Sequence, residues 1–263
     1  MPRQVIVNAD DFGLSPNENA VIFAAFQAGV ISSATAMANM PAFEAACAMA
    51  RHPTLQGRVG LHFNLTYGRP LSQAILARRT FCDDFGVFDL SLPRHSFSLG
   101  REDREAVREE LQVQWQRCVD HGMRPSHIDS HQHVHNIWPI GEIVARFAAQ
   151  QGVPIRLARN LGQNLNLPKR VFKGLLNWRL QRLAGVTADY VCTPVDLRNG
   201  SAPTDGVLEI VAHPTQLGAG FGDAYLNPDE SLSSVLEQRL RGIARVSYAD
   251  LNKDFLRGAT ALD

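Results

Sequence analysis

The sequence predicts an α/β fold in which mostly parallel strands form a distorted, TIM-like (β/α) barrel within a single domain. Short runs rich in β-branched residues alternate with helical patterns along the whole chain, which is typical of a parallel sheet covered by helices. The length of 263 residues suits one large core. An open doubly wound sheet fits the same alternation, and in both folds functional side chains gather at the carboxyl ends of the strands.

The strands are expected where short apolar runs are bounded by polar or glycine-containing segments. These runs are residues 5–7, 33–39, 59–65, 126–131, 154–159, 188–193 and 207–212. Residues 66–100 show poor periodicity, and they are expected to form a long loop or small insertion.

The first helix has the clearest start and stop signals. Ser15 suits its N-cap, Pro16 its first position and Glu18 the reciprocal acid of a capping box. Gly29 suits its C-cap. Further helices are expected at residues 41–52, 101–121, 138–151, 168–183 and 228–244.

The composition is that of an ordinary globular protein. The 26 basic and 26 acidic side chains balance, so no global attraction to nucleic acid or to an anionic membrane is expected. The basic residues of 169–182 alternate with apolar ones, and we interpret that segment as an amphipathic helix packed on the core. The short apolar start, the lack of a run of about 20 apolar residues and four scattered cysteines predict a cytoplasmic protein without a membrane span or disulfides.

Two adjacent acids, Asp10 and Asp11, end the first strand. Successive strand side chains point to opposite faces, so both acids reach one pocket only if the chain turns there. Phe12-Gly13 makes such a turn plausible. One carboxylate could then bind a cation while the other acts as a base; a helix-capping loop with two solvated acids is the alternative.

The segment from His127 to His135 holds four histidines within nine residues. Strand alternation places His127, Asp129, His131, His133 and His135 on one face for as long as the strand lasts. Neutral imidazole is the commonest side-chain metal ligand. A surface histidine-rich loop is the alternative.

Two further histidines stand at expected strand ends. His62 belongs to the run 59–65, and His213 follows the run 207–212. Each alone is as easily a buried core histidine. Taken with the acids and the histidine segment, they would meet at one rim of a barrel, where a carboxylate and two histidines form a common Lewis-acid metal site.

These motifs resemble the YdjC-like family of carbohydrate deacetylases. The matching segments are residues 7–15, 60–63, 127–135 and 212–214. The resemblance implies a YdjC-like domain over residues 1–263, which binds one divalent metal ion, Zn²⁺ or Mg²⁺, and removes the acetyl group from an N-acetylated carbohydrate. It also implies a homodimer. Two histidines and one carboxylate suit zinc better than magnesium.

The resemblance also implies roles for individual residues. Asp11, His62 and His131 resemble the metal ligands. Asp10 resembles the general base and His213 the general acid. Residues that resemble supporting or substrate-contacting groups are Asp129, His133, His135 and either Arg156 or Arg159 as the partner that orients the base. Aromatic candidates for stacking on a sugar are Phe63, Tyr67, Trp138, Phe221 and Tyr225.

The sequence departs from the family pattern in places, and other functions stay open. Gln132 stands where the family often has histidine, and residues 67–99 and 161–183 match nothing in the pattern. The alternatives are a phosphoesterase or amidohydrolase on a similar barrel, and a barrel that binds sugar without catalysis. The former often carry a His-x-His pair at the end of the first strand, where this chain has Asp10 and Asp11.

Overall fold

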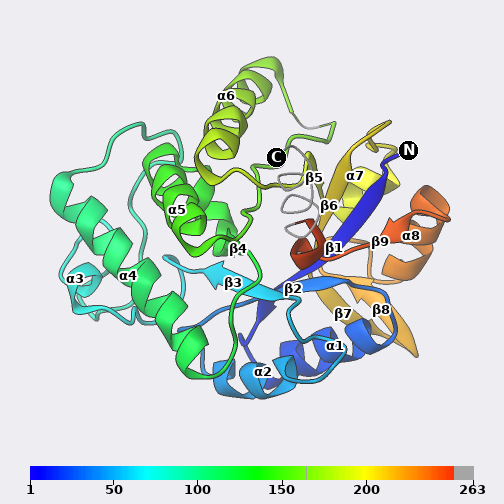
Figure 1. The fold of residues 1–263 in the computed structure, drawn as a ribbon, viewed down its shortest axis with the longest axis horizontal. Coiled ribbons are helices and arrows are strands. Elements are labelled where there is room, and N and C mark those ends of the chain that lie inside the picture. Colours follow the sequence, from blue (N-terminus) through cyan, green and yellow to red (C-terminus); the bar gives the residue numbers. More distant parts are fainter. Residues whose placement is uncertain (164, 252–263) are drawn as a thin grey trace, which may run out of the picture.

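The structure, a computed structural model, describes residues 1–163 and 165–251 (Figure 1). Its main sheet has the strand order β4-β3-β2-β1-β6-β5, all pairs are parallel, and β9 pairs with β1 beside that path. The strands are β1 (Gln4–Phe12), β2 (Ser33–Ala36), β3 (Val59–Phe63), β4 (Ile128–Ser130), β5 (Tyr190–Cys192), β6 (Val207–Ala212) and β9 (Ala244–Arg245). The predicted parallel sheet is confirmed.

The sheet curls into a half-barrel. β1 lies at its centre, between β2 and β6. Beyond the edge strand β4, single parallel bridges join Ile128 to Ile155 and Ile155 to Thr187. Because Thr187 lies just before β5, the other edge strand, these bridges link the two edges of the curled sheet through Ile155. The prediction of a distorted, barrel-like α/β fold is confirmed in this form.

Helices surround the sheet (Figure 1). They are α1 (Pro16–Gln27), α2 (Phe43–Ala50), α3 (Gln73–Leu76), α4 (Arg101–Asp120), α5 (Trp138–Gln151), α6 (Leu167–Ala184), α7 (Pro194–Arg198) and α8 (Leu232–Leu240), with a 3₁₀ segment η1 (His131–Asn136) after β4. Because helices cover the sheet, β1 is buried along nearly its whole length. Among the described residues, no helix has both the length and the apolar character needed to cross a membrane.

Helix α1 begins where its capping signals predict, whereas its C-cap is Ala28, one residue before the expected Gly29. Ser15 caps it, and the Ser15 hydroxyl donates to the carboxylate of Glu18. Gly29 follows the helix with a φ of 68°, which glycine adopts without steric cost. The side chain of Asn19 accepts a hydrogen bond of 2.6 Å from the backbone N–H of Gly13. This bond ties α1 to the loop that leaves the carboxyl end of β1.

Other predicted elements differ from the structure. Residues 154–159 form no regular strand, since only Ile155 makes bridges. Residues 214–223, where no strand is expected, form an antiparallel hairpin of β7 (Pro214–Leu217) and β8 (Gly220–Asp223). Gly218 has a φ of 55° in its turn, so the glycines serve the hairpin. Residues 66–100 are mostly loop, as expected, apart from α3.

The extent of the predicted single domain, residues 1–263, stays a prediction. Residues 164 and 252–263 lie outside the described residues.

Candidate active site

Asp10 and Asp11 reach one cluster because β1 is irregular at its end. The register of β1 against β2 shifts between Ala9 and Phe12, and Asp11 has a φ of 68°. A left-handed backbone is costly for a residue other than glycine, and such strain is often found at functional sites. The turn that the sequence required therefore begins at Asp11 itself and continues through Gly13, with a φ of 89°.

His62 and His131 both face Asp11. The Oδ1 atom of Asp11 lies 2.9 Å from Nδ1 of His131 and 3.3 Å from Nε2 of His62. One possible ligand atom from each of the three residues lies within 4.8 Å of the other two. They come from the ends of β1 and β3 and from the start of η1. The structure therefore brings together the three residues that resemble metal ligands.

Asp129 fixes the orientation of His62. Its Oδ1 atom lies 2.7 Å from Nδ1 of His62, and the hydroxyl of Thr35 donates to its Oδ2 atom at 3.0 Å. Nε2 of His62 is thereby left facing Asp11. Carboxylates commonly hold metal-binding histidines in this way. Burial opposes a charge on His62, but Asp129 and Asp10 outweigh it and raise the pKa of His62 to about 10. The cluster therefore favours positive charge at this position.

The donor set of Asp11, His62 and His131 suits a divalent cation. Two imidazole nitrogens and one carboxylate oxygen leave further coordination positions for water or substrate. A second set, formed by Asp10, His62 and Asp129, is equally compact. We favour the first set because Asp10 and Asp129 are both bound to the guanidinium of Arg156. That positive charge would repel a cation placed between them.

Arg156 is a buried cation that joins three carboxylates. It donates to both oxygens of Asp10, at 2.7 and 2.8 Å, and to Glu209 at 2.7 Å. It also lies 2.6 Å from Asp129. Burial opposes ionisation of Asp10, but Arg156 outweighs it and holds the pKa of that carboxyl well below its usual range. Asp10 is therefore ionised at neutral pH, with its orientation fixed.

The sequence left open whether Arg156 or Arg159 contacts Asp10, and the structure places Arg156 there. Arg159 instead forms a salt bridge of 2.9 Å with Asp196. The backbone between these arginines is irregular, so strand alternation gives no guide to which one reaches β1.

A second layer of polar residues supports the arginine and was not among the predicted site residues. The hydroxyl of Tyr248 donates to Glu209, and its ring stacks on His127 with centroids 4.0 Å apart. Nε2 of His127 lies 3.2 Å from Oδ1 of Asn8, and the Asn8 amide donates to Asp10 at 2.9 Å. Glu209 could have indicated this layer from the sequence, because it is an acid inside an apolar strand and a buried acid needs a charged or hydrogen-bonding partner.

A cavity of about 520 Å³ contains His213. Its lining residues are His133, Asn136, Arg159, Lys173, Thr193, Val195, Asp196, Val211, His213 and Tyr225. Nε2 of His213 lies 4.0 Å from Asp10 and 3.9 Å from Asp11. Its Nδ1 is buried without a hydrogen-bond partner among the described residues. His213 therefore connects the cavity with both acids of β1.

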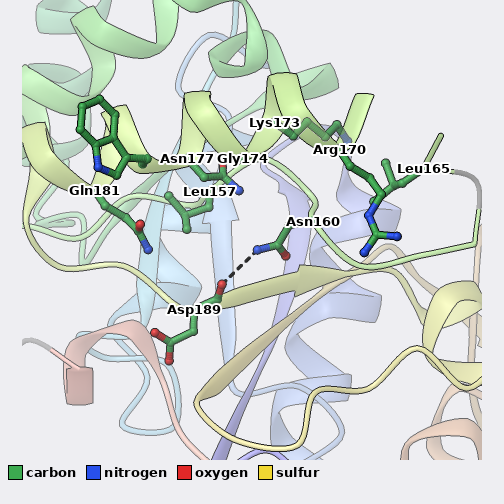
Figure 2. Close-up of a pocket in the computed structure, with 10 residues that line it drawn as sticks. Leu157, Asn160, Leu165, Arg170, Lys173, Gly174, Asn177, Gln181 and Asp189 are labelled. Atoms are coloured by element: carbon green, nitrogen blue, oxygen red, sulfur yellow. Dashed lines mark hydrogen bonds between the residues drawn. The ribbon is translucent and has the colours of Figure 1, made fainter. Parts of the chain in front are cut away.

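A second cavity, of about 260 Å³, lies against α6 and contains none of the predicted site residues (Figure 2). Because it contacts neither acid of β1 and none of the site histidines, we assign the candidate active site to the larger cavity.

The histidine segment leaves the strand earlier than expected. β4 ends at Ser130, and Gln132 and His133 in η1 have left-handed φ angles of 48° and 55°. The shared strand face, expected for as long as the strand lasts, therefore ends at Ser130, one residue before the expected strand end. His133 still lines the cavity. His135 is buried, with its Nδ1 atom 2.5 Å from the hydroxyl of Ser130. It therefore stabilises the turn of the 3₁₀ segment and does not line the cavity.

Two of the five aromatic candidates lie near the candidate site. Tyr225 lines the cavity and meets the ring of His213 edge-on, at a centroid distance of 4.9 Å. Tyr67 is exposed, and its ring centroid lies 6.3 Å from that of His131. The other three pack into the protein and are Phe63, Phe221 and Trp138.

The buried ring of His127 predicts a measurable pH dependence of stability. Burial, and then the charge of Arg156, hold the pKa of His127 well below its usual 6.5. The unfolded chain takes up a proton on this ring near pH 6.5, whereas the folded protein does not. The free energy of unfolding should therefore be largest above that pH and fall as the pH drops below it.

We expect the substitution His127→Gln to remove about 1.4 kcal/mol per pH unit from this slope. Urea unfolding between about pH 7 and 5 measures it. The exposed His52 provides a matched control, since His52→Gln leaves the buried ring in place. Equal slopes for His127→Gln and the unaltered protein would contradict the assignment.

Fold and site together define an α/β half-barrel protein with a candidate Asp–His cation site and an arginine-bound carboxylate beside one cavity. The family model described as YdjC-like protein matches residues 4–231. The chain belongs to the YdjC-like family, as its motifs indicated.

Several relatives have names that describe an activity. A protein of Geobacillus stearothermophilus named carbohydrate deacetylase is 36% identical over 269 residues, which cover 96% of this chain and 100% of that one. A protein of Salmonella paratyphi B named chitooligosaccharide deacetylase is 40% identical over 163 residues, or 60% of this chain and 61% of that one.

The fold also matches a solved structure. A crystal structure from Enterococcus faecalis, of a protein named as a candidate for cellobiose-phosphate cleavage, superposes with a TM-score of 0.71. The sequence identity is 25%, and the match covers 95% of this chain and 99% of that one.

Proposed function

We propose that the protein is a metal-dependent hydrolase that removes the N-acetyl group from an N-acetylated sugar or oligosaccharide and releases acetate. The observation that carries this proposal is the cation site of Asp11, His62 and His131 directly beside Asp10 and His213. The names of the relatives support the sugar as the substrate class.

Asp11, His62 and His131 would hold one divalent cation. When bound, such an ion supplies Lewis-acid chemistry by polarising an amide carbonyl and lowering the pKa of a water molecule. The nitrogen-rich donor set favours zinc or another transition ion over magnesium, which prefers oxygen ligands.

The residues around the cation site divide the proton transfers between them. Asp10, ionised and held by Arg156, accepts the proton of the attacking water. His213 lines the larger cavity and donates a proton to the leaving nitrogen. Arg156 keeps Asp10 ionised and fixed in orientation, so Asp10 can accept a proton, while the ring of His213 lies 4.0 Å from it on the side of the cavity.

The test is acetate release from a panel of N-acetylated glycans, with and without a chelator. We expect acetate from at least one glycan, loss of activity with the chelator and recovery when zinc is added. Phosphate release from phosphorylated sugars instead of acetate would favour a phosphoesterase. Binding of N-acetylated sugars without acetate release by the metal-loaded protein would favour a sugar-binding barrel. The cytoplasmic location and the homodimer stay predictions.

A further inference from the structure

The outward side of α6 carries an apolar stripe of four side chains that are each more than half exposed. The exposed fractions are 74% for Leu167, 55% for Val171, 55% for Leu175 and 54% for Trp178. Their spacing of four, four and three residues places them on one side of the helix. The opposite side already buries Leu176 and Leu180 in the core, so the outward stripe, here called the α6 face, is not needed for folding.

Helix α6 is also strongly basic. Its basic residues are Lys169, Arg170, Lys173, Arg179 and Arg182, and it contains no acidic residue, although the whole chain is balanced at 26 of each. Arg179 is neutralised by Glu142 at 2.7 Å. The described part of the chain supplies no acidic ion-pair partner for the exposed Lys169, Arg170 and Arg182. The local charge around the α6 face is therefore positive.

The basic groups flank the apolar stripe. The guanidinium of Arg182 lies 5.0 Å above the ring of Trp178. On the other flank, Arg170 and Asp189 line the smaller cavity (Figure 2). The carboxylate of Asp189 accepts a hydrogen bond from the backbone N–H of Val207 at 2.7 Å, so it is already engaged in the fold. The α6 face is therefore an apolar stripe bordered by cationic side chains.

We propose that the α6 face docks on a lipid surface that carries anionic head groups. Leucine, valine and tryptophan side chains enter the boundary between head groups and acyl chains, and flanking cations bind the head-group phosphates. A second copy of this chain is the other candidate occupant. Two α6 faces placed together would bring the unpaired cations of both copies into proximity, and this repulsion favours the lipid surface.

Docking through α6 would hold the candidate active site beside the lipid. Lys173 lines both the smaller cavity against α6 and the larger cavity that contains His213. One helix therefore separates the α6 face from the larger cavity. This consequence rests on the proposed function, whereas docking itself does not.

Vesicle flotation of the full chain tests the proposal. We expect binding to vesicles of phosphatidylcholine mixed with phosphatidylglycerol, little binding to phosphatidylcholine alone, and weaker binding as salt is added. The double variant Leu175→Ser/Trp178→Ser should partition about 10-fold more weakly, and so should Arg170→Gln/Arg182→Gln. Phe85, which is 80% exposed in another segment, gives the control Phe85→Ser, expected to bind unchanged.

Two further measurements separate docking from folding and from catalysis. The double variants should unfold at the same urea concentration as the unaltered protein and release acetate from a soluble N-acetylated sugar at the same rate. The proposal would be overturned if the protein did not bind anionic vesicles, or if Leu175→Ser/Trp178→Ser bound them as strongly as the unaltered protein. So would a dimer in solution that this double variant dissociates, because the second copy would then be the occupant.

Discussion

Replacing Asp10 by asparagine is expected to lower the rate of acetate release by about 10²–10⁴-fold while the protein still binds its metal. Asparagine has nearly the same shape, but its amide does not accept a proton from water. Asp10 is bound by Arg156 and is not a member of the favoured donor set, which contains Asp11, His62 and His131. Acetate release and the metal content of the purified variant are the two measurements.

The same experiment distinguishes the two possible donor sets. Asp11→Asn and His131→Gln should weaken metal binding if the first set is correct, because neither residue belongs to the set of Asp10, His62 and Asp129. Metal loss in Asp10→Asn, with normal metal content in His131→Gln, would instead favour the second set. Near-normal turnover of Asp10→Asn would reject its role as the base.

The convergence at the end of β1 could be predicted from the sequence because it follows from topology. Parallel strands bring their carboxyl ends to one edge, so Asp11 and His62 had to meet wherever β1 and β3 belonged to one sheet. The backbone conformation at Asp11 could not be predicted from the sequence. Its φ of 68° belongs to the tertiary fold, and a pattern of side chains does not contain that information.

The interior of the site could not be predicted because it depends on contacts between distant segments. Arg156 is separated from Asp10 by 146 residues and from Glu209 by 53. Arg156 and Arg159 are equally plausible until the irregular backbone between them is known. In the same way, the left-handed residues Gln132 and His133 follow the end of the strand at Ser130, and the alternation of histidines gives no sign of that turn.

Helix α6 shows a limit of periodicity arguments. The sequence predicts an amphipathic helix packed on the core, and its inner residues Leu176 and Leu180 do pack there. A second apolar stripe, which includes Leu175 and Trp178, also has helical spacing but faces outward. Periodicity identifies stripes, and only the tertiary fold determines which of two stripes is buried.

Replacing Arg156 by methionine is expected to lower the free energy of unfolding by about 3–5 kcal/mol. The side chain is 1% exposed, and its loss leaves Asp10, Asp129 and Glu209 buried without their shared cation. Urea unfolding measures the change. Arg159→Met is the matched control, because its salt bridge with Asp196 is partly exposed and is worth at most about 1 kcal/mol. Equal stability of the two variants would contradict the role of Arg156.

The variant Arg156→Lys separates support of the fold from orientation of the base. Lysine keeps the positive charge but lacks the planar set of donors that lets one guanidinium contact Asp10, Asp129 and Glu209 together. We therefore expect stability between that of the methionine variant and the unaltered protein, normal metal content and a reduced rate of acetate release at saturating substrate. If Arg156 served stability alone, the folded lysine variant would turn over at the normal rate, because Asp10 would still be ionised and correctly placed.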